Sequence, residues 1–218
     1  MDLINYTLFT FSGDIPVLLI DVLTAIVGLS CVFLAGRNNK YNFWVGYIYT
    51  TLLFLMFWNK NLYASILLQP ISLAINALGH YRWTHPKKNE ESNTDHSALK
   101  VSILSWKERG IAIGAVFLFA VVWGWLISLL GNKLFVGVFS ADPVPYLDSC
   151  VTVLILVAQY LSAQKKWDCW IAWLFVNVTQ LILHLSVGHI FMPIVSGLYL
   201  INGIISLYNW YKLYNKGN

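Results

Sequence analysis

The sequence predicts an all-α integral membrane protein with seven transmembrane helices, arranged as two parallel three-helix repeats joined by one helix (3+1+3). Three observations support this prediction. Of the 218 residues, 58% are hydrophobic and 11% are charged, with a mean hydropathy of +0.63, whereas soluble domains carry about 25% charged residues. Apolar runs long enough to cross a bilayer recur along the chain. The first three runs match the last three in spacing.

Seven apolar runs, each bounded by charges or turn residues, define the expected helices. They cover residues 16–36, 43–58, 61–83, 110–131, 145–163, 168–187 and 189–211. We expect helices because lipid offers no hydrogen-bond partner to free backbone groups, and the runs lack the alternation of barrel strands. The chain starts with a polar stretch that has no basic region, so we expect no cleaved signal peptide.

The lysines and arginines orient these helices. Twelve lie on one side of the expected membrane, and only Lys60 and Lys133 lie on the other. Basic loops remain in the cytoplasm, so the N-terminus is expected outside and the C-terminus inside. We attribute the net charge of +4 to these loops and expect no nucleic-acid partner. Cys31, Cys150 and Cys169 lack the spacing of a zinc site or a disulfide framework, and no metal or cofactor is expected.

Comparison of the chain with itself indicates a repeat. "PVLLID" at 16–21 matches "PVPYLD" at 143–148. The offset is 127 residues, with a slip of one near the first loop that pairs Trp44 with Trp170. Each repeat holds three helices, so the single helix between them makes the repeats parallel. Internal repeats with a site at their interface are typical of transporters.

This repeat divides the chain into six expected segments. They are an extracytoplasmic N-terminal stretch (1–15), the first repeat (16–83) and a cytoplasmic loop (84–109). A linking helix with an outer loop (110–142), the second repeat (143–211) and a cytoplasmic tail (212–218) follow. Because the cytoplasmic loop mixes both signs of charge, we expect it to be a flexible connector.

One face of the sixth expected helix is aromatic and polar. Trp170, Trp173 and Asn177 follow one another at steps of three or four residues, so they form a stripe turned away from lipid. The alternative is structural, because tryptophans also mark the membrane interface and amides join helices. Other helices contribute similar side chains, namely Gln159, Gln69, Trp44, Tyr47, Asn76, Tyr199 and Asn202. Together they predict a polar cavity between the repeats.

Acidic side chains lie away from the middle of the membrane. Asp21 and Asp148 occur near the outer end of the first helix of each repeat, where helix capping is expected. Ion-coupled carriers often use intramembrane carboxylates, so the sequence favours facilitated diffusion. A cavity of rings and amides suits an uncharged or cationic aromatic ligand.

Two long runs resemble the PnuC-type nicotinamide riboside transporters. They are "YASILLQPISLAINALGHYRW" at 63–83 and "DSCVTVLILVAQYLSAQKKWDCWIAWLFVNV" at 148–178. The match extends over nearly the whole chain from residue 16 and is weakest in the 84–109 loop and the fourth helix. It implies a fold related to the SWEET sugar transporters, in the bacterial inner membrane and commonly as a homotrimer.

The resemblance also implies uniport of nicotinamide riboside, with a cytoplasmic nucleoside kinase that traps the product by phosphorylation. By motif match, Trp170, Trp173, Asn177, Gln159 and Gln69 are expected to contact the substrate. Trp44, Tyr47 and Asn76 follow from the repeat.

Three alternatives remain open. Related members are assigned to thiamine or riboflavin, so either vitamin is an alternative substrate. A seven-helix receptor shares the orientation, although the loops are short and the last helix has no internal lysine for a retinal Schiff base. An intramembrane enzyme is disfavoured, because Ser196 lies in the last helix with no later histidine to activate it. No catalytic residue is expected.

Overall fold

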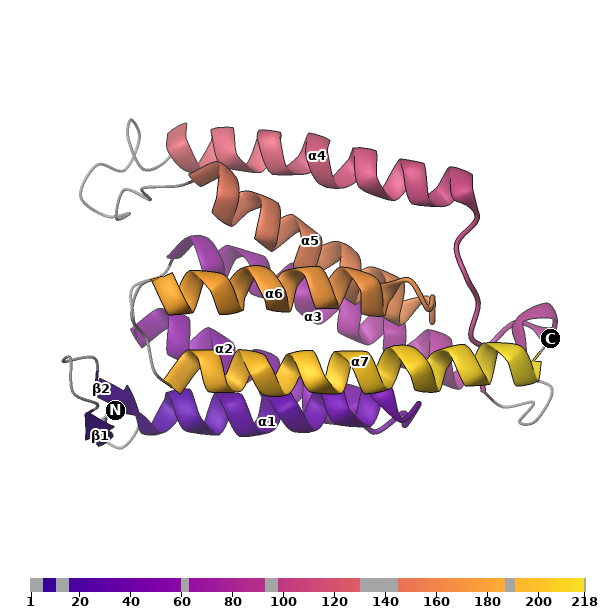
Figure 1. Ribbon diagram of the computed structural model, residues 1–218, viewed down its shortest axis with the longest axis horizontal. Helices are drawn as coiled ribbons and strands as arrows, with labels where there is room; N and C mark the ends of the chain where they lie inside the picture. Colours follow the sequence, from indigo (N-terminus) through magenta and orange to yellow (C-terminus); the bar gives the residue numbers. More distant parts are fainter. Residues whose placement is uncertain are drawn as a thin grey trace.

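The computed structural model describes residues 6–10, 16–59, 63–92, 98–129, 145–186 and 191–217. Within them the chain forms seven α-helices, which confirms the predicted number. They are α1 Leu19–Gly36, α2 Asn42–Asn59, α3 Tyr63–Thr84, α4 Trp106–Leu129, α5 Pro145–Ala163, α6 Cys169–Ser186 and α7 Phe191–Gly217. The helices lie roughly along one axis, and successive helices run in opposite directions (Figure 1).

Six helices form a closed ring. α1 packs against α2 and α7, α3 packs against α2 and α5, and α6 packs against α5 and α7. α4 lies outside this ring and packs mainly against α5 (Figure 1). The first three helices therefore meet the last three along two seams, one between α1 and α7 and the other between α3 and α5.

One end of the bundle carries the positive charge. At this end α1, α3, α5 and α7 finish and α2, α4 and α6 begin; we call it the basic end. All the lysines and arginines of the described residues lie there: Arg37, Lys40, Arg82, Lys87, Lys88, Lys100, Lys107, Arg109, Lys165, Lys166, Lys212 and Lys216.

The outer faces of the helices are apolar. On α4, Ile111 is 71% exposed and Phe117 is 73% exposed, which suits contact with lipid rather than water. By length and composition, three helices among the described residues can cross a membrane, over 19–36, 106–126 and 192–217. α2, α5 and α6 contain shorter apolar stretches. α3 carries Gln69, Asn76 and Arg82, which lower its hydropathy.

Several helix ends differ from the prediction. α4 begins four residues before the predicted start because Ser105 and Glu108 form a capping box: the Ser105 N–H donates to Glu108 (2.7 Å) and the Glu108 N–H donates to Ser105 Oγ (3.3 Å). α7 continues beyond residue 211 to Gly217. Residues Pro16–Leu18, predicted as helix, form a strand (β2) paired antiparallel with Thr7–Thr10 (β1).

The 84–109 loop also differs from its prediction as a flexible connector. It contains a short 3-10 helix, η1 Lys88–Glu90, and then residues 98–105, which we call the strap. The strap crosses the basic end and buries Leu99, Val101 and Leu104 in the hydrophobic core. Its Ser102 receives a hydrogen bond from the N–H of Trp167 (2.8 Å). The prediction was wrong for these residues because Leu99 and Val101 alternate with polar side chains, as in an extended chain that packs on a core, and Leu104 is buried after them.

The turns that follow α1 and α5 have the same geometry. Asn38 and Lys165 both adopt the left-handed backbone conformation, with φ of 59° and 55°. The N–H of Asn39 donates to Leu34 (3.0 Å), and the N–H of Lys166, 127 residues later, donates to Leu161 (2.9 Å). This bond satisfies a carbonyl at each helix end.

Two tryptophans join the halves across the seams. The Trp83 indole N–H donates to the carbonyl of Ser162 (3.1 Å), and the Trp210 indole N–H donates to the carbonyl of Ala35 (3.1 Å). Trp83 and Trp210 are 127 positions apart, as are Ala35 and Ser162. The two indoles also contact each other, with ring centroids 5.7 Å apart.

Small residues allow the seams to close. A Cβ atom at Gly36 on α1 would collide with the Ser206 side chain on α7, and one at Gly79 on α3 would lie 3.1 Å from Ala163 Cα on α5. Positions 36 and 163 are 127 apart, as are 79 and 206. Each of these two contacts therefore has one glycine, which lies on α1 at the first seam and on α3, the counterpart of α7, at the second.

Candidate functional site

The α6 stripe faces the interior of the ring. Trp170 is 1% exposed and Asn177 is 6% exposed, while Trp173 packs against the same core cluster as Trp170. The Trp170 ring meets Trp210 edge to face, with centroids 5.5 Å apart. Its indole nitrogen is buried and has no hydrogen-bond partner among the described residues.

Other helices of the ring also bury polar groups. Gln69 on α3 is 8% exposed and Ser196 on α7 is 5% exposed. Thr24 Oγ1 on α1 and Gln159 Oε1 on α5 are buried without a hydrogen-bond partner in the described chain. Buried polar atoms are normally paired, and an unpaired one costs about 1–3 kcal/mol. These atoms are therefore available to a polar ligand that enters the ring.

Tyr199 forms a contact within the fold. Its hydroxyl shares a hydrogen bond with Tyr49 on α2 and lies against Gly28 on α1. Tyr49 and Thr24 were missed by the sequence reasoning. The four-residue step from Thr24 to Gly28, which places a polar and a small residue on one face of α1, was the available signal.

Three predicted residues gather on α2 and α3, near the basic end. Trp44 is 59% exposed, and its ring lies edge-on to His80 at 5.3 Å. The hydroxyl of Tyr47 lies 3.3 Å from Nδ1 of His80. The Asn76 amide donates to the carbonyl of Phe43 (3.1 Å), which ties α3 to α2. The structure does not bring these side chains together with the α6 stripe.

The pairing of Trp44 with Trp170 is wrong. Phe43 is buried and meets Trp83 edge to face at 5.0 Å, just as Trp170 meets Trp210. Phe43 and Trp170 are 127 positions apart, and their N–H groups donate to residues 40 and 167, which are also 127 apart. The one-residue slip is therefore absent from this turn. Trp44 and Tyr47 remain predicted substrate contacts, but without support from the repeat.

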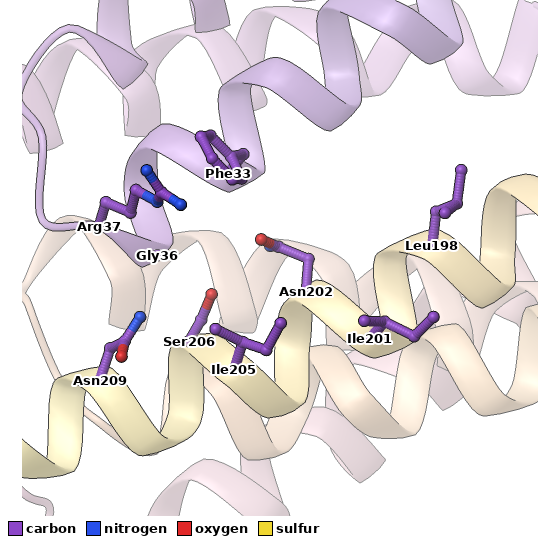
Figure 2. Close-up of a pocket in the computed structure, with 9 residues that line it drawn as sticks. All are labelled: Phe33, Gly36, Arg37, Leu198, Ile201, Asn202, Ile205, Ser206 and Asn209. Atoms are coloured by element: carbon purple, nitrogen blue, oxygen red, sulfur yellow. The ribbon is translucent and has the colours of Figure 1, made fainter.

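Asn202 lines a cavity at the α1–α7 seam. The cavity has a volume of about 270 Å³ and also contacts Phe33 and Gly36 of α1 (Figure 2). In Figure 2 the Asn202 side chain points from α7 towards α1, and its amide nitrogen is buried without a partner in the described residues. None of the other nine predicted site residues lines this cavity.

A helical bundle with an apolar exterior and unpaired polar atoms in its interior defines a class of protein, the multi-pass membrane transporters. The sequence profile described as "Nicotinamide mononucleotide transporter" matches residues 18–212. The chain belongs to this family.

Individual relatives agree with this assignment. The nicotinamide riboside transporter PnuC of Escherichia coli K12 is 30% identical over 174 residues, covering 75% of this chain and 73% of the relative. The riboflavin/roseoflavin transporter RibM of Streptomyces davaonensis is 27% identical over 182 residues, covering 82% of this chain and 78% of the relative. The crystal structure of the vitamin B3 transporter PnuC shares the fold, with a TM-score of 0.69 over 91% of this chain and 83% of that one, at 20% identity. These relatives are transporters and not enzymes.

Proposed function

We propose that the chain imports nicotinamide riboside by facilitated diffusion. The observation that carries this proposal is the set of buried, unpaired polar atoms on four helices of the ring, at Thr24, Gln159, Trp170 and Asn202. Nicotinamide riboside combines a cationic pyridinium ring with hydroxyls and a carboxamide. Indole faces attract such a cation, and amide side chains both donate to and accept from hydroxyls and carboxamides.

The placement of buried carboxylates supports uniport. Among the described residues, the buried carboxylates are Asp21 and Asp168, and both lie at helix ends. Asp21 accepts a hydrogen bond from the N–H of Leu18 (3.2 Å), and Asp168 accepts one from the N–H of Leu104 (2.8 Å). Neither lies in the middle of a helix, where coupled carriers often place a carboxylate. Net uptake then depends on a cytoplasmic nucleoside kinase that phosphorylates the imported nucleoside. The Asp148 side chain lies outside the described part of the chain.

We further propose the parallel 3+1+3 arrangement of the SWEET-like fold. It is supported by the ring with two seams, by the reciprocal bonds of Trp83 and Trp210, and by the matched turns at Asn38 and Lys165. The concentration of lysine and arginine at the basic end supports a cytoplasmic location for that end, with the N-terminus outside, in the bacterial inner membrane. Assembly as a homotrimer follows from the family resemblance.

A sister vitamin is the second candidate substrate. The RibM relative is named for riboflavin, and thiamine shares a cationic aromatic ring with nicotinamide riboside. We expect calorimetry of the purified protein to show binding of nicotinamide riboside and not of thiamine or riboflavin. Proteoliposomes should then equilibrate the riboside without a sodium or proton gradient. Preference for another vitamin would contradict the proposed substrate. Accumulation of the riboside above its external concentration would contradict uniport.

A further inference from the structure

A second cavity opens at the basic end, away from the interior of the ring. Its volume is about 410 Å³, within the range of about 300–1,000 Å³ that is typical of small-molecule sites. It is lined by the turn 37–41, by Trp83 and Thr84 at the end of α3, and by Ala98 and Lys165. It therefore lies between the α1–α2 turn and the strap.

The wall of this cavity is positively charged. Arg37, Lys40 and Lys165 line it, and among the described residues no acidic side chain does. Arg37 and Lys40 are exposed, and neither forms an ion pair in the described part of the chain. The Arg37 guanidinium lies over the Phe33 ring, 4.0 Å from its centroid, which orders it. Lys165 is buried, donates to the carbonyl of Leu99 and lies over the Trp83 ring.

The strap covers one of the two matched turns and leaves the other open. At the α5–α6 turn, the carbonyl of Lys165 accepts from the Ser102 N–H (3.2 Å), and the N–H of Trp167 donates to the Ser102 carbonyl (2.8 Å). The groups at the same places in the α1–α2 turn are the carbonyl of Asn38 and the N–H of Lys40. Neither is paired with another described residue. The cavity lies against this unpaired turn.

The side chain of Asn38 adds an unpaired acceptor. Its Oδ1 atom is buried without a hydrogen-bond partner among the described residues. An acceptor of this kind favours a ligand that supplies a donor such as a hydroxyl. Two free cations favour a ligand with concentrated negative charge, and guanidinium groups match phosphate oxygens in geometry.

From this combination we propose that the cavity binds a phosphate monoester that also carries a hydroxyl group, such as a sugar phosphate. Arg37 and Lys40 contact the phosphate, and Asn38 accepts a hydrogen bond from the hydroxyl. A soluble sugar phosphate and a phospholipid headgroup share this chemistry. The proposal does not depend on which nucleoside crosses the membrane. Arg37 also lines the Asn202 cavity, whereas the other residues of the second cavity do not.

The test is calorimetry on the full-length, delipidated protein in phosphate-free buffer, with ribose 5-phosphate, inorganic phosphate and ribose as probes. We expect ribose 5-phosphate to bind and ribose not to bind. The Arg37→Gln/Lys40→Gln variant should bind ribose 5-phosphate about tenfold more weakly or worse, because charged hydrogen bonds are lost. The matched control is Lys212→Gln/Lys216→Gln, which removes two exposed charges at the same end but outside the cavity; it should bind as the wild type does.

A second variant tests the hydroxyl contact without threatening the fold. Glycine suits the left-handed conformation of residue 38, so Asn38→Gly should fold normally. It should bind inorganic phosphate like the wild type but lose the preference for ribose 5-phosphate. Equal preference in the wild type and Asn38→Gly would overturn the role of Asn38.

The bound phosphate can belong to a soluble sugar phosphate or to a phospholipid headgroup. Mass spectrometry of the phospholipid that the protein retains before delipidation distinguishes these two ligands. Binding of ribose 5-phosphate that depends on Arg37 and Lys40 supports a soluble ligand. Absence of that binding, together with phospholipid retention that falls in Arg37→Gln/Lys40→Gln, supports a lipid headgroup. If neither probe binding nor lipid retention differs between the wild type and this variant, the proposal is wrong.

Discussion

The Arg109 guanidinium donates a hydrogen bond to the Asp168 carboxylate at 2.8 Å and ties the start of α4 to the start of α6. The other oxygen of Asp168 accepts from the N–H of Leu104 in the strap, also at 2.8 Å. Since Asp168 is 7% exposed, one buried carboxylate holds together two helices and the strap at the basic end.

Replacement of that carboxylate should loosen the strap. We expect Asp168→Asn to lower the free energy of unfolding by about 1.5–3 kcal/mol, the range for hydrogen bonds to charged groups. Thermal unfolding and limited proteolysis within 98–105 measure the effect. Lys107→Gln, which removes a neighbouring exposed charge, is the control and should leave the strap protected. Wild-type protease resistance in Asp168→Asn would show that the carboxylate does not hold the strap.

The interior stripe of α6 should be required for substrate binding. Trp173→Ala and Asn177→Ala are expected to abolish binding of nicotinamide riboside with normal membrane insertion, because they remove a ring face and an amide from the interior. Phe175→Ala is the matched control on the same helix, since Phe175 is 64% exposed. Calorimetry on the purified variants makes the comparison. Normal binding by both interior variants would refute the predicted site.

The glycine contacts at the seams predict a rescue. Gly36→Ala should destabilise the protein by about 1–3 kcal/mol because its methyl group collides with Ser206. Addition of Ser206→Gly should restore most of this loss, because the double variant places alanine and glycine as Ala163 and Gly79 are placed at the other seam. Thermal unfolding of the two single variants and the double variant gives the coupling energy. If the stability changes of the two single variants simply added in the double variant, the contact between residues 36 and 206 would be contradicted.

The indole bonds across the seams should contribute similarly in the two halves. Trp83→Phe and Trp210→Phe each remove one indole-to-carbonyl hydrogen bond, worth about 1 kcal/mol, and leave a partly filled space. Both tryptophans are buried, so each variant should lower the melting temperature by a similar amount. Trp106→Phe is the control, since Trp106 is 83% exposed. A loss confined to one variant would show that the seams are unequal.

Sequence reasoning predicted the helices closely because lipid imposes one strong rule, that an apolar run must satisfy its own backbone hydrogen bonds. No comparable rule covers the ends of the bundle. The β1–β2 pairing depends on backbone hydrogen bonds between two short segments, and the strap depends on contacts between distant residues. Hydropathy reports neither. Ser102, for example, pairs with the turn at 165–167.

The error at Trp44 has a different cause. Identity of residue type favoured matching Trp44 with Trp170, whereas two turns of equal length keep the offset at 127 and place Phe43 in the core. The burial of Trp170 and Asn177 agrees with the predicted direction of the stripe. Whether the stripe binds substrate stays a prediction.

The position of α4 outside the ring affects which amino-acid substitutions this helix can accept during evolution. A helix inside the ring must fit two neighbours and leave room for polar groups, so each substitution there meets several constraints. Apart from its contact with α5, α4 exposes apolar side chains that face no other helix, and lipid accepts any apolar side chain of reasonable size. Mutations should accumulate faster on its outer face, at positions such as Ile113, Phe117 and Val121, than at the seams.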